Sequence, residues 1–400
     1  MLRKNAMNII DADASSGDVL ATEEFPLPPI IDLFAGVGGL TLGASRAGFR
    51  VSLAVELDPH AIAAHQKNFP KVKHLRCDIG ELDGKMMLDK AGLSAGTLAG
   101  LIGGPPCQGF SVMGRRHTAD PRNNLFKKFF QLVAECKPYF FLAENVLGLL
   151  EDNFIEIRRD ALSVIPADYV VLDPIRLRAH DFGAPTIRER AFFIGYHREF
   201  LESLSVCDID KYKVNKITSV GQALLGLPSI RGDWTSEAQG WRRTSGFPKG
   251  YYGSRITGCI PTGVGDPESI RRYREEGLVS GCLGTRHAPE ISARYGRLRP
   301  GEQCKVSKSS RLRIDGLCPT LRAGTDADHG SHQAVRPIHP TRPRVITPRE
   351  AARLQGFPDW FQFAPSKWHS FRQIGNSVSP LVAEAVLSVI AKKLKARSHR

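Results

Sequence analysis

The segment TLAGLIGGPPCQGFS, residues 97–111, joins an apolar run to a cysteine that follows two prolines. The run at 97–104 predicts a buried strand, because strands of a sheet covered on both faces are apolar along their whole length. The prolines fix the backbone and remove amide donors, so they present Cys107 rigidly at a strand end. A thiol in such a place is a candidate nucleophile, and a small buried side chain in a strand–loop corner is the structural alternative.

Similar apolar runs alternate with amphipathic stretches from residue 28 to about residue 200. We predict strands at 30–36, 51–57, 73–79, 97–104, 139–146, 169–175 and 190–196. Amphipathic segments such as PHAIAAHQKNF (59–69) and NLFKKFFQLVAECK (124–137) predict helices between them. This alternation favours an α/β fold with a mostly parallel sheet covered on both faces.

The pattern changes near residue 205. From 205 to 316, glycines, arginines and aromatic residues mix without clear periodicity, and 19 Lys and Arg stand against 11 Asp and Glu. A helix is predicted from Thr347, where Thr347 and Glu350 can form a capping box around Pro348. A second helix is predicted after Ser379, with an apolar face on residues 381–390.

Composition limits the class of protein. A chain of 400 residues with 42% hydrophobic residues suits two domains, or one domain with an insertion. The net charge of +14 favours a polyanionic partner such as nucleic acid. The eight cysteines include no CxxC pair or metal-ligand spacing, so we expect reduced thiols and no bound metal. The first 27 residues form a polar leader, and no apolar run reaches 18 residues, so we expect neither secretion nor a membrane span.

DLFAGVGGL (32–40) predicts a strand, a glycine turn and a helix. Gly36, Gly38 and Gly39 do not complete GxGxxG, and no Gly-Lys-Ser/Thr follows, so a phosphate loop is not expected. Glu56 ends the next strand, where a carboxylate can accept both hydroxyls of a ribose, and Asp78 ends the third. A glycine turn with two acids and no phosphate clamp suits a nucleoside carrying a positive group, such as S-adenosylmethionine.

Seven motifs occur in a fixed order: DLFAGVGGL, Glu56 in VELD, Asp78 in CDI, GGPPCQGFS, ENV at 144–146, IRERAFFIG at 187–195 and RQIGNSVSP at 372–380. In this order the chain resembles the DNA cytosine-5 methyltransferase family of bacterial restriction–modification type. The resemblance covers most of 28–200 and 317–390. It implies a class I S-adenosylmethionine-dependent methyltransferase fold, Rossmann-like, with a small inserted target-recognition domain.

The resemblance also implies domain boundaries and catalytic residues. A catalytic domain would comprise 28–204 and 317–400, with the recognition domain at 205–316 between its two parts. Cys107 matches the nucleophile that attacks carbon 6 of cytosine, and Glu144 matches the group at ring nitrogen 3. Arg190 would contact the flipped base and support the thiolate, while Arg188 would help to bind base or backbone.

Further residues are implied by the same resemblance. Phe34 would pack against the adenine, and the glycine turn, Glu56 and Asp78 would bind the rest of the nucleoside. The pocket would be lined and completed by Ile79, Pro106, Leu125, Asn376 and Val378. The loop after the cysteine would contact DNA through Ser111, Arg115, Arg116 and Arg122. One departure is Thr186, at a position where the family often has glutamine.

We therefore expect an enzyme that acts on duplex DNA as a monomer, away from membranes, inside a bacterial cell. A separately acting restriction endonuclease is left open as a partner. Two alternatives also stay open: an RNA cytosine-5 methyltransferase on the same scaffold, and a catalytically silent DNA-binding regulator. The second has no physical need for Cys107, Glu144 and both arginines together.

Overall fold

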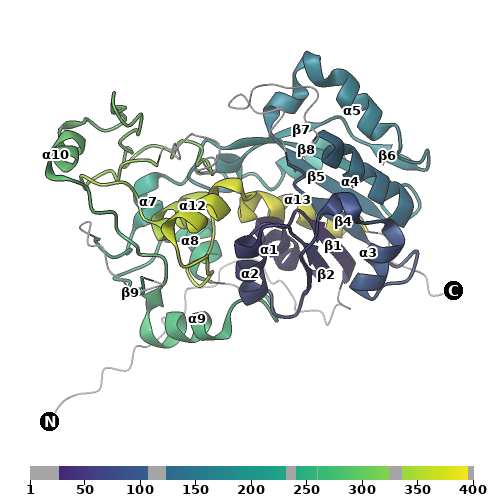
Figure 1. The fold of residues 1–400 in the computed structure, drawn as a ribbon, viewed down its shortest axis with the longest axis horizontal. Coiled ribbons are helices and arrows are strands. Elements are labelled where there is room, and N and C mark those ends of the chain that lie inside the picture. The colour runs from purple at the N-terminus through teal and green to yellow at the C-terminus, as the bar shows by residue number, and fades with distance from the viewer. Residues whose placement is uncertain (1–26, 107–122, 231–239, 259, 324–335, 395–400) are drawn as a thin grey trace, which may run out of the picture.

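The fold is taken from a computed structural model, which describes residues 27–106, 123–230, 240–258, 260–323 and 336–394. An eight-stranded sheet has the order β3-β2-β1-β4-β5-β8-β6, and β7 also pairs with β8 (Figure 1). Strands β1 to β5 run parallel, and β8 is antiparallel to β5, β6 and β7. The predicted mostly parallel sheet is confirmed. The strands are β1 Leu27–Leu33, β2 Phe49–Val55, β3 Lys73–Leu75, β4 Gly100–Gly103, β5 Phe140–Asn145, β6 Tyr169–Val171, β7 Ile175–Arg178 and β8 Glu189–His197.

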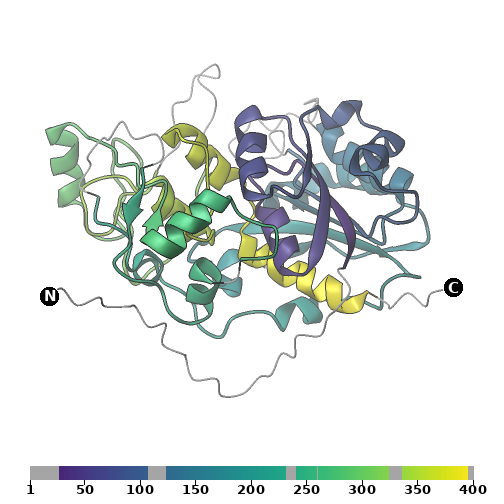
Figure 2. The same ribbon diagram turned by 90° about the horizontal axis from the view of Figure 1, so that it is seen from below.

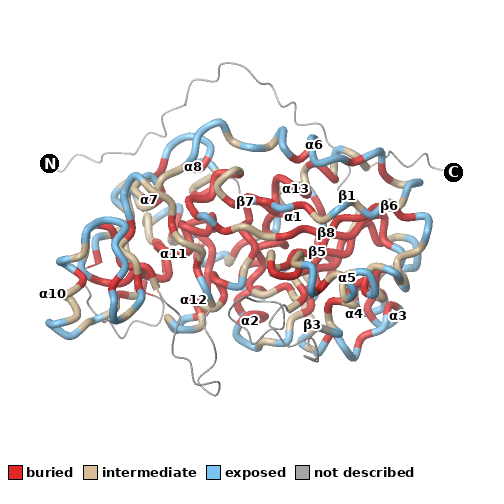
Figure 3. The backbone as a smooth tube through the Cα atoms, turned by 90° about the horizontal axis from the view of Figure 1, so that it is seen from above, coloured by how far each residue is buried: buried red, intermediate tan, exposed pale blue. Residues whose placement is uncertain are grey.

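Helices cover both faces of this sheet. Ile30 and Ile31 lie in different hydrophobic clusters, because successive side chains of a strand point to opposite faces. One cluster includes residues of α1 and α13, and the other includes residues of α3, α4 and α5. The buried strands form the centre of Figure 3. The helices of this part are α1 Gly39–Arg46, α2 Pro59–Asn68, η1 Ile79–Glu81, α3 Gly84–Ala91, α4 Asn123–Cys136, η2 Leu147–Leu150, η3 Asp152–Phe154, α5 Ile155–Leu162 and η4 Ala179–Phe182.

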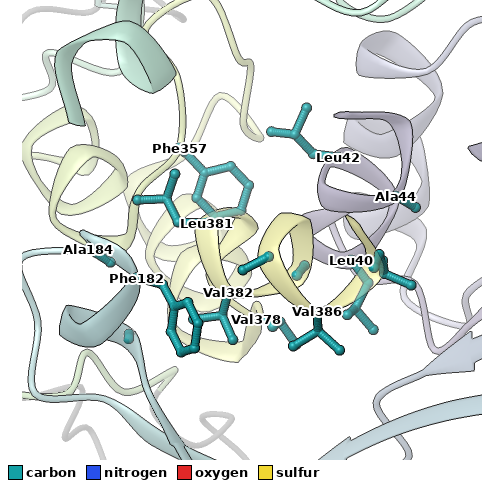
Figure 4. Packing of buried hydrophobic residues seen from close by; sticks show 14 of the residues in the cluster. Leu40, Leu42, Ala44, Phe182, Ala184, Phe357, Val378, Leu381, Val382 and Val386 are labelled. Carbon is teal, nitrogen blue, oxygen red and sulfur yellow. The ribbon is translucent and has the colours of Figure 1, made fainter. Parts of the chain in front are cut away.

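The C-terminal helix α13, Pro380–Lys393, packs against the first helix of the chain. Figure 4 shows Val378, Val382 and Val386 on one side of the interface and Leu40 on the other. A Cβ at Gly43 would lie 2.3 Å from the Cβ of Ala383, so this glycine permits the close approach. The stretch Lys367–Lys393 is long and apolar enough to cross a membrane, but 83% of its 18-residue apolar window is buried inside the protein, as in a core helix.

The described residues of the segment 205–316 form short helices and two two-residue strands, and the sequence of the segment has no clear periodicity. Most of it lies at one end of the molecule (Figure 2), while residues 260–264 reach the sheet beside β2 and β3. Its apolar side chains nevertheless join the cluster around α13, so the core runs continuously between the two regions. Its elements are α6 Val206–Asp210, α7 Val220–Leu224, β9 Arg242–Arg243, α8 Gly250–Thr257, α9 Pro267–Arg271, the π-helix η5 Arg272–Glu276, β10 Leu278–Val279 and α10 Pro289–Arg297.

Helix α11, Pro348–Gln355, joins this segment to the rest of the core. Thr347 and Glu350 form the predicted capping box, with Pro348 at the first helical position. Arg353 forms a two-pronged ion pair with Asp359, at 2.8 and 2.7 Å, and both side chains are fully buried. The same guanidinium donates to the carbonyls of Ala223 and Leu225 in the inserted segment. Helix α12, Lys367–Asn376, follows and leads into α13.

Candidate active site

The glycine turn after β1 forms the first wall of the site. Phe34 has φ of 55°, Gly36 also 55° and Gly38 101°. A bulky residue in the left-handed region is strained, and such strain collects at functional sites. Hydrogen bonds from the Ala35 amide to the Val55 carbonyl (3.0 Å) and from the Gly38 amide to the Ala35 carbonyl (2.9 Å) hold the turn.

The three glycines of this turn face different surroundings. A Cβ at Gly38 would lie 2.3 Å from the Phe69 ring, and one at Gly39 would lie 2.3 Å from the Val378 carbonyl oxygen. At Gly36 the nearest protein atom would be 4.0 Å away. Gly38 and Gly39 therefore serve close packing within the protein, and Gly36 borders open space where a ligand can approach the backbone.

Glu56 connects this turn to the end of β2. Its Oε2 accepts a hydrogen bond from the Gly36 amide at 2.8 Å, and its Oε1 accepts one from the Asp58 amide at 2.8 Å. A carboxylate has about four acceptor positions, so both oxygens can still accept ribose hydroxyls. Burial raises the pKa of Glu56, although the two amides oppose this effect.

Asp78 is exposed beyond β3, where its Oδ1 accepts from the Gly80 amide at 2.8 Å and caps η1. Ile79, the next residue, is buried. Leu125 Cδ2 lies 3.8 Å from the position that a Cβ would take at Gly80, so Leu125 from α4 sits beside the Asp78 turn. The structure thus brings these three predicted pocket residues together.

Glu144 and Arg190 form the second half of the site. Glu144 lies on β5 opposite Phe192 of β8, so Arg190 is its diagonal neighbour on the same face. Arg190 Nε lies 3.0 Å from Glu144 Oε1, and both side chains are largely buried. Gly104 lies next to this carboxyl, since a Cβ there would be 3.5 Å from Glu144 Oε2.

The proline pair follows directly. Asn145 donates through Nδ2 to the Pro105 carbonyl at 3.3 Å, which ties the chain after β4 to the end of β5. Pro106 is half-buried and is the last described residue before 107–122. Cys107, Ser111, Arg115, Arg116 and Arg122 lie outside the described residues.

Arg188 has different surroundings from Arg190. It is 3% exposed, and its Nη1 donates to the Gly375 carbonyl at 2.9 Å and, more weakly, to the Leu321 carbonyl at 3.4 Å. The chain at 185–187 also pairs with Cys318, through Cys318 amide to Pro185 carbonyl and Ile187 amide to Cys318 carbonyl, each at 2.9 Å. This region therefore fastens the returning C-terminal part of the chain to β8.

The returning chain also reaches the glycine turn. Val378 is buried, with its carbonyl against Gly39, while Asn376 is exposed at the end of α12. Gln355 donates to the Ser377 carbonyl at 2.8 Å and so holds this connection. Residues 376–378 therefore lie beside the first turn, and the contribution of Asn376 and Val378 to the pocket stays a prediction.

Sequence reasoning missed a buried hydrogen-bond chain beneath the turn. Thr41 Oγ1 donates to Asp32 Oδ2 at 2.6 Å, and His65 Nε2 lies 3.0 Å from the same hydroxyl. His65 Nδ1 lies 2.8 Å from His74 Nε2. Since Thr41 donates to Asp32, it accepts from His65 Nε2–H, which leaves Nδ1 to accept from His74. No local sequence signal marks these residues, because they come from β1, α1, α2 and β3.

Burial is the main cause of the pKa shifts in this row of hydrogen-bonded side chains. It raises the pKa of Asp32 to about 7, against the hydrogen bond from Thr41, and Glu56 adds to the rise. It lowers the pKa of His65 well below its usual value, and lowers that of His74. His65 is therefore neutral at pH 7, as the direction of its hydrogen bonds requires.

We expect Thr41→Val to destabilise the protein by about 2–4 kcal/mol, because Asp32 Oδ2 and His65 Nε2 both lose their hydrogen bond to the buried hydroxyl. Denaturant unfolding followed by circular dichroism measures this loss. Thr41→Ser keeps the hydroxyl and is the matched control, with a smaller loss from the missing methyl. Equal losses in the two variants would contradict a role for the hydroxyl.

The fold and this site define a class I S-adenosylmethionine-dependent methyltransferase. Over residues 29–392 the chain matches the C-5 cytosine-specific DNA methylase family, and it belongs to that family. It is an enzyme that uses S-adenosylmethionine as methyl donor. The predicted family, fold class and cofactor are confirmed.

Named relatives extend along almost the whole chain. The Type II methyltransferase M.XorII of Xanthomonas oryzae pv. oryzae is 38% identical over 377 residues, which cover 92% of this chain and 86% of the relative. M.FnuDI of Fusobacterium nucleatum is 37% identical over 379 residues, covering 92% and 94%. A crystal structure described as a putative DNA modification methyltransferase encoded within a prophage (E. coli) is 46% identical with a TM-score of 0.82, covering 92% and 99%.

The S. pombe Dnmt2 methyltransferase shares the fold. Its structure is 16% identical, with a TM-score of 0.57, and the match covers 91% of this chain and 98% of that one.

Proposed function

We propose that this protein methylates carbon 5 of cytosine within one short sequence of duplex DNA, as the modification enzyme of a Type II system. The Glu144–Arg190 pair beside Gly104 is the observation that carries the proposal, because it places an acid and a cation at the base of the segment that leads to Cys107. The Type II assignment rests on relatives such as M.XorII. The cognate endonuclease would act separately, and the enzyme would act as a monomer.

Cys107 is the proposed nucleophile. Its thiolate adds to carbon 6 of cytosine, a C–S bond forms, and electron density moves to ring nitrogen 3, where Glu144 donates a proton or hydrogen bond. Carbon 5 is then nucleophilic enough to take the methyl group. Loss of the carbon 5 proton to a base expels the thiolate and restores the ring. When bound, S-adenosylmethionine supplies the electrophilic methyl group.

The two arginines have separate proposed roles. Arg190 contacts Glu144 and would hold its carboxyl toward the base while its positive charge favours the thiolate. Arg188 is buried against the carbonyls of Gly375 and Leu321, so we assign it a positioning role. It would fix the returning chain that carries Asn376 and Val378 to the pocket, in place of the contact to base or backbone expected from sequence.

Base flipping is required by the geometry of the reaction. A cytosine stacked in a duplex cannot admit a thiolate to one face and a sulfonium to the other, so it must leave the stack at a cost of a few kcal/mol. Ser111, Arg115, Arg116 and Arg122 are the proposed contacts to the DNA backbone. The basic segment 205–316 is the proposed target-recognition domain, and 28–204 with 317–400 the catalytic domain.

The residues around Gly36 fit the methyl donor. Gly36 borders open space, and the Glu56 carboxylate next to it retains acceptor positions for ribose hydroxyls. Phe34, in its strained conformation, would pack against the adenine, with Asp78 at the exocyclic amino group. Ile79, Pro106 and Leu125 would line the remaining walls.

We expect the affinity for S-adenosylmethionine to fall as the pH is lowered, because the raised pKa of Glu56 causes its carboxylate to take up a proton earlier than an exposed one. Glu56→Gln should weaken binding by about 10–100-fold at neutral pH, the equivalent of one or two charged hydrogen bonds, and reduce the pH response. Calorimetric titration across pH measures both effects. Glu156→Gln, at an exposed glutamate on α5, should bind as the wild type does.

Bisulfite sequencing of host DNA that expresses this chain tests the proposal. We expect 5-methylcytosine at one position of one short sequence and at no other cytosine. Host tRNA from the same cells should stay unmethylated beyond its background. Methylation confined to RNA would overturn the assignment of DNA as substrate.

A further inference from the structure

A basic cavity of about 880 Å³ lies at the amino ends of β2 and β3, at the opposite edge of the sheet from the glycine turn. Ile260 to Val264 of the inserted segment also line it. Its walls carry five cations and one acid: Arg46, Arg50, Lys71, Lys73, Arg255 and Glu384.

The acid that lines this cavity does not neutralise all of its cations. Glu384 is shared by Arg46, at 3.5 Å, and Arg255, at 2.9 Å. Among the described residues no acid pairs with Arg50, Lys71 or Lys73, and all three are exposed. The walls therefore hold a surplus of positive charge that favours an anionic occupant.

The chain itself supplies a segment of matching charge. Residues 5–26 contain five acids and no Lys or Arg: Asp11, Asp13, Asp18, Glu23 and Glu24. Strand β1 begins at Leu27, which pairs with Phe49, and Phe49 lines the cavity. At about 3.6 Å per residue, Glu23 can lie no more than about 14 Å from Leu27.

We propose that residues 5–26 dock in this basic cavity through their carboxylates. Covalent linkage gives these carboxylates an effective concentration of about 1 mM or more at the cavity. They would therefore compete well against free anions. The docked segment would neutralise the cationic edge of the molecule opposite the active site and keep DNA phosphates from binding there.

Zero-length carbodiimide cross-linking of the full chain, followed by peptide mapping, identifies the occupant. We expect amides between Lys71 or Lys73 and the acids at 11–24, at a yield independent of protein concentration. Lys71→Gln with Lys73→Gln should abolish these products, and Lys85→Gln, on α3, should not affect them. Cross-links that form only between molecules, or none to residues 11–24, would overturn the proposal.

Lysine acylation measured by mass spectrometry gives an independent readout. Replacing the five acids by Asn or Gln in the full chain should raise acylation of Lys71 and Lys73 several-fold. Lys85 and Lys305 serve as internal references. High salt should have the same effect on the wild type, because it screens the attraction. Equal rates in both proteins, or protection that arises only with added duplex DNA, would contradict the proposal.

Discussion

Cys107→Ser should lower the rate of methyl transfer on the order of 10³-fold or more, while binding of S-adenosylmethionine and duplex DNA persists. Thiols are much stronger acids than alcohols, so a cysteine supplies some thiolate near neutral pH. A serine hydroxyl remains protonated there and is a far poorer nucleophile toward carbon 6. Transfer of labelled methyl to DNA gives the rate, and filter binding gives the affinity for DNA.

A second variant tests whether the loss of activity is specific to Cys107 or follows from replacing any cysteine by serine. Cys207→Ser alters an exposed cysteine on α6 and should transfer methyl groups at the wild-type rate. If Cys107→Ser kept full activity, covalent attack by this residue would be excluded. If it lost DNA binding as well, its role would be structural.

Asp359→Asn should destabilise the protein by about 3–5 kcal/mol, the loss typical of breaking a buried ion pair from one side. Asp359 and Arg353 are both fully buried, and the substitution leaves the guanidinium without its counter-charge. That guanidinium also holds the carbonyls of Ala223 and Leu225, so the inserted segment should loosen with it. The denaturation midpoint and hydrogen exchange in α7 measure the two effects.

An exposed pair of the same composition is the control. Arg313 and Asp315 also form a two-pronged contact, at 3.0 and 2.7 Å, but both side chains are exposed. Asp315→Asn should leave the midpoint unchanged, because water replaces the lost contact. Similar destabilisation by the two variants would show that burial is not the cause.

Strong local signals explain what could be predicted. The seven predicted strands occur as strands of the sheet, and all but Lys73–Leu75 are short apolar runs between polar segments. The helix at Thr347 was predicted from three residues, since a capping box and a proline act within one turn. Strand β7 was not separated from the preceding run, because Ile175–Arg178 alternates over only four residues.

The candidate site likewise contains residues that sequence motifs identify and residues whose surroundings the sequence does not reveal. Glu56, Glu144 and Arg190 were identified from motifs, and the structure gives their partners: the Gly36 amide for Glu56, and each other for Glu144 and Arg190. The surroundings of Arg188 were beyond prediction, since they depend on carbonyls more than a hundred residues away. The hydrogen bonds that link the side chains of Asp32, Thr41, His65 and His74 were also beyond prediction, because these residues share no local sequence pattern.

The sequence by itself determined the family, the alternation of strands and helices, and the residue types that the reaction needs. These follow from local periodicity and from motifs in a fixed order. Only the tertiary structure decided that Gly38 and Gly39 serve packing while Gly36 faces open space, and that Arg188 is a buried clamp. The reason is physical: a residue's chemistry is local, but its burial and partners are set by chain segments that meet only when the sheet and its helices assemble.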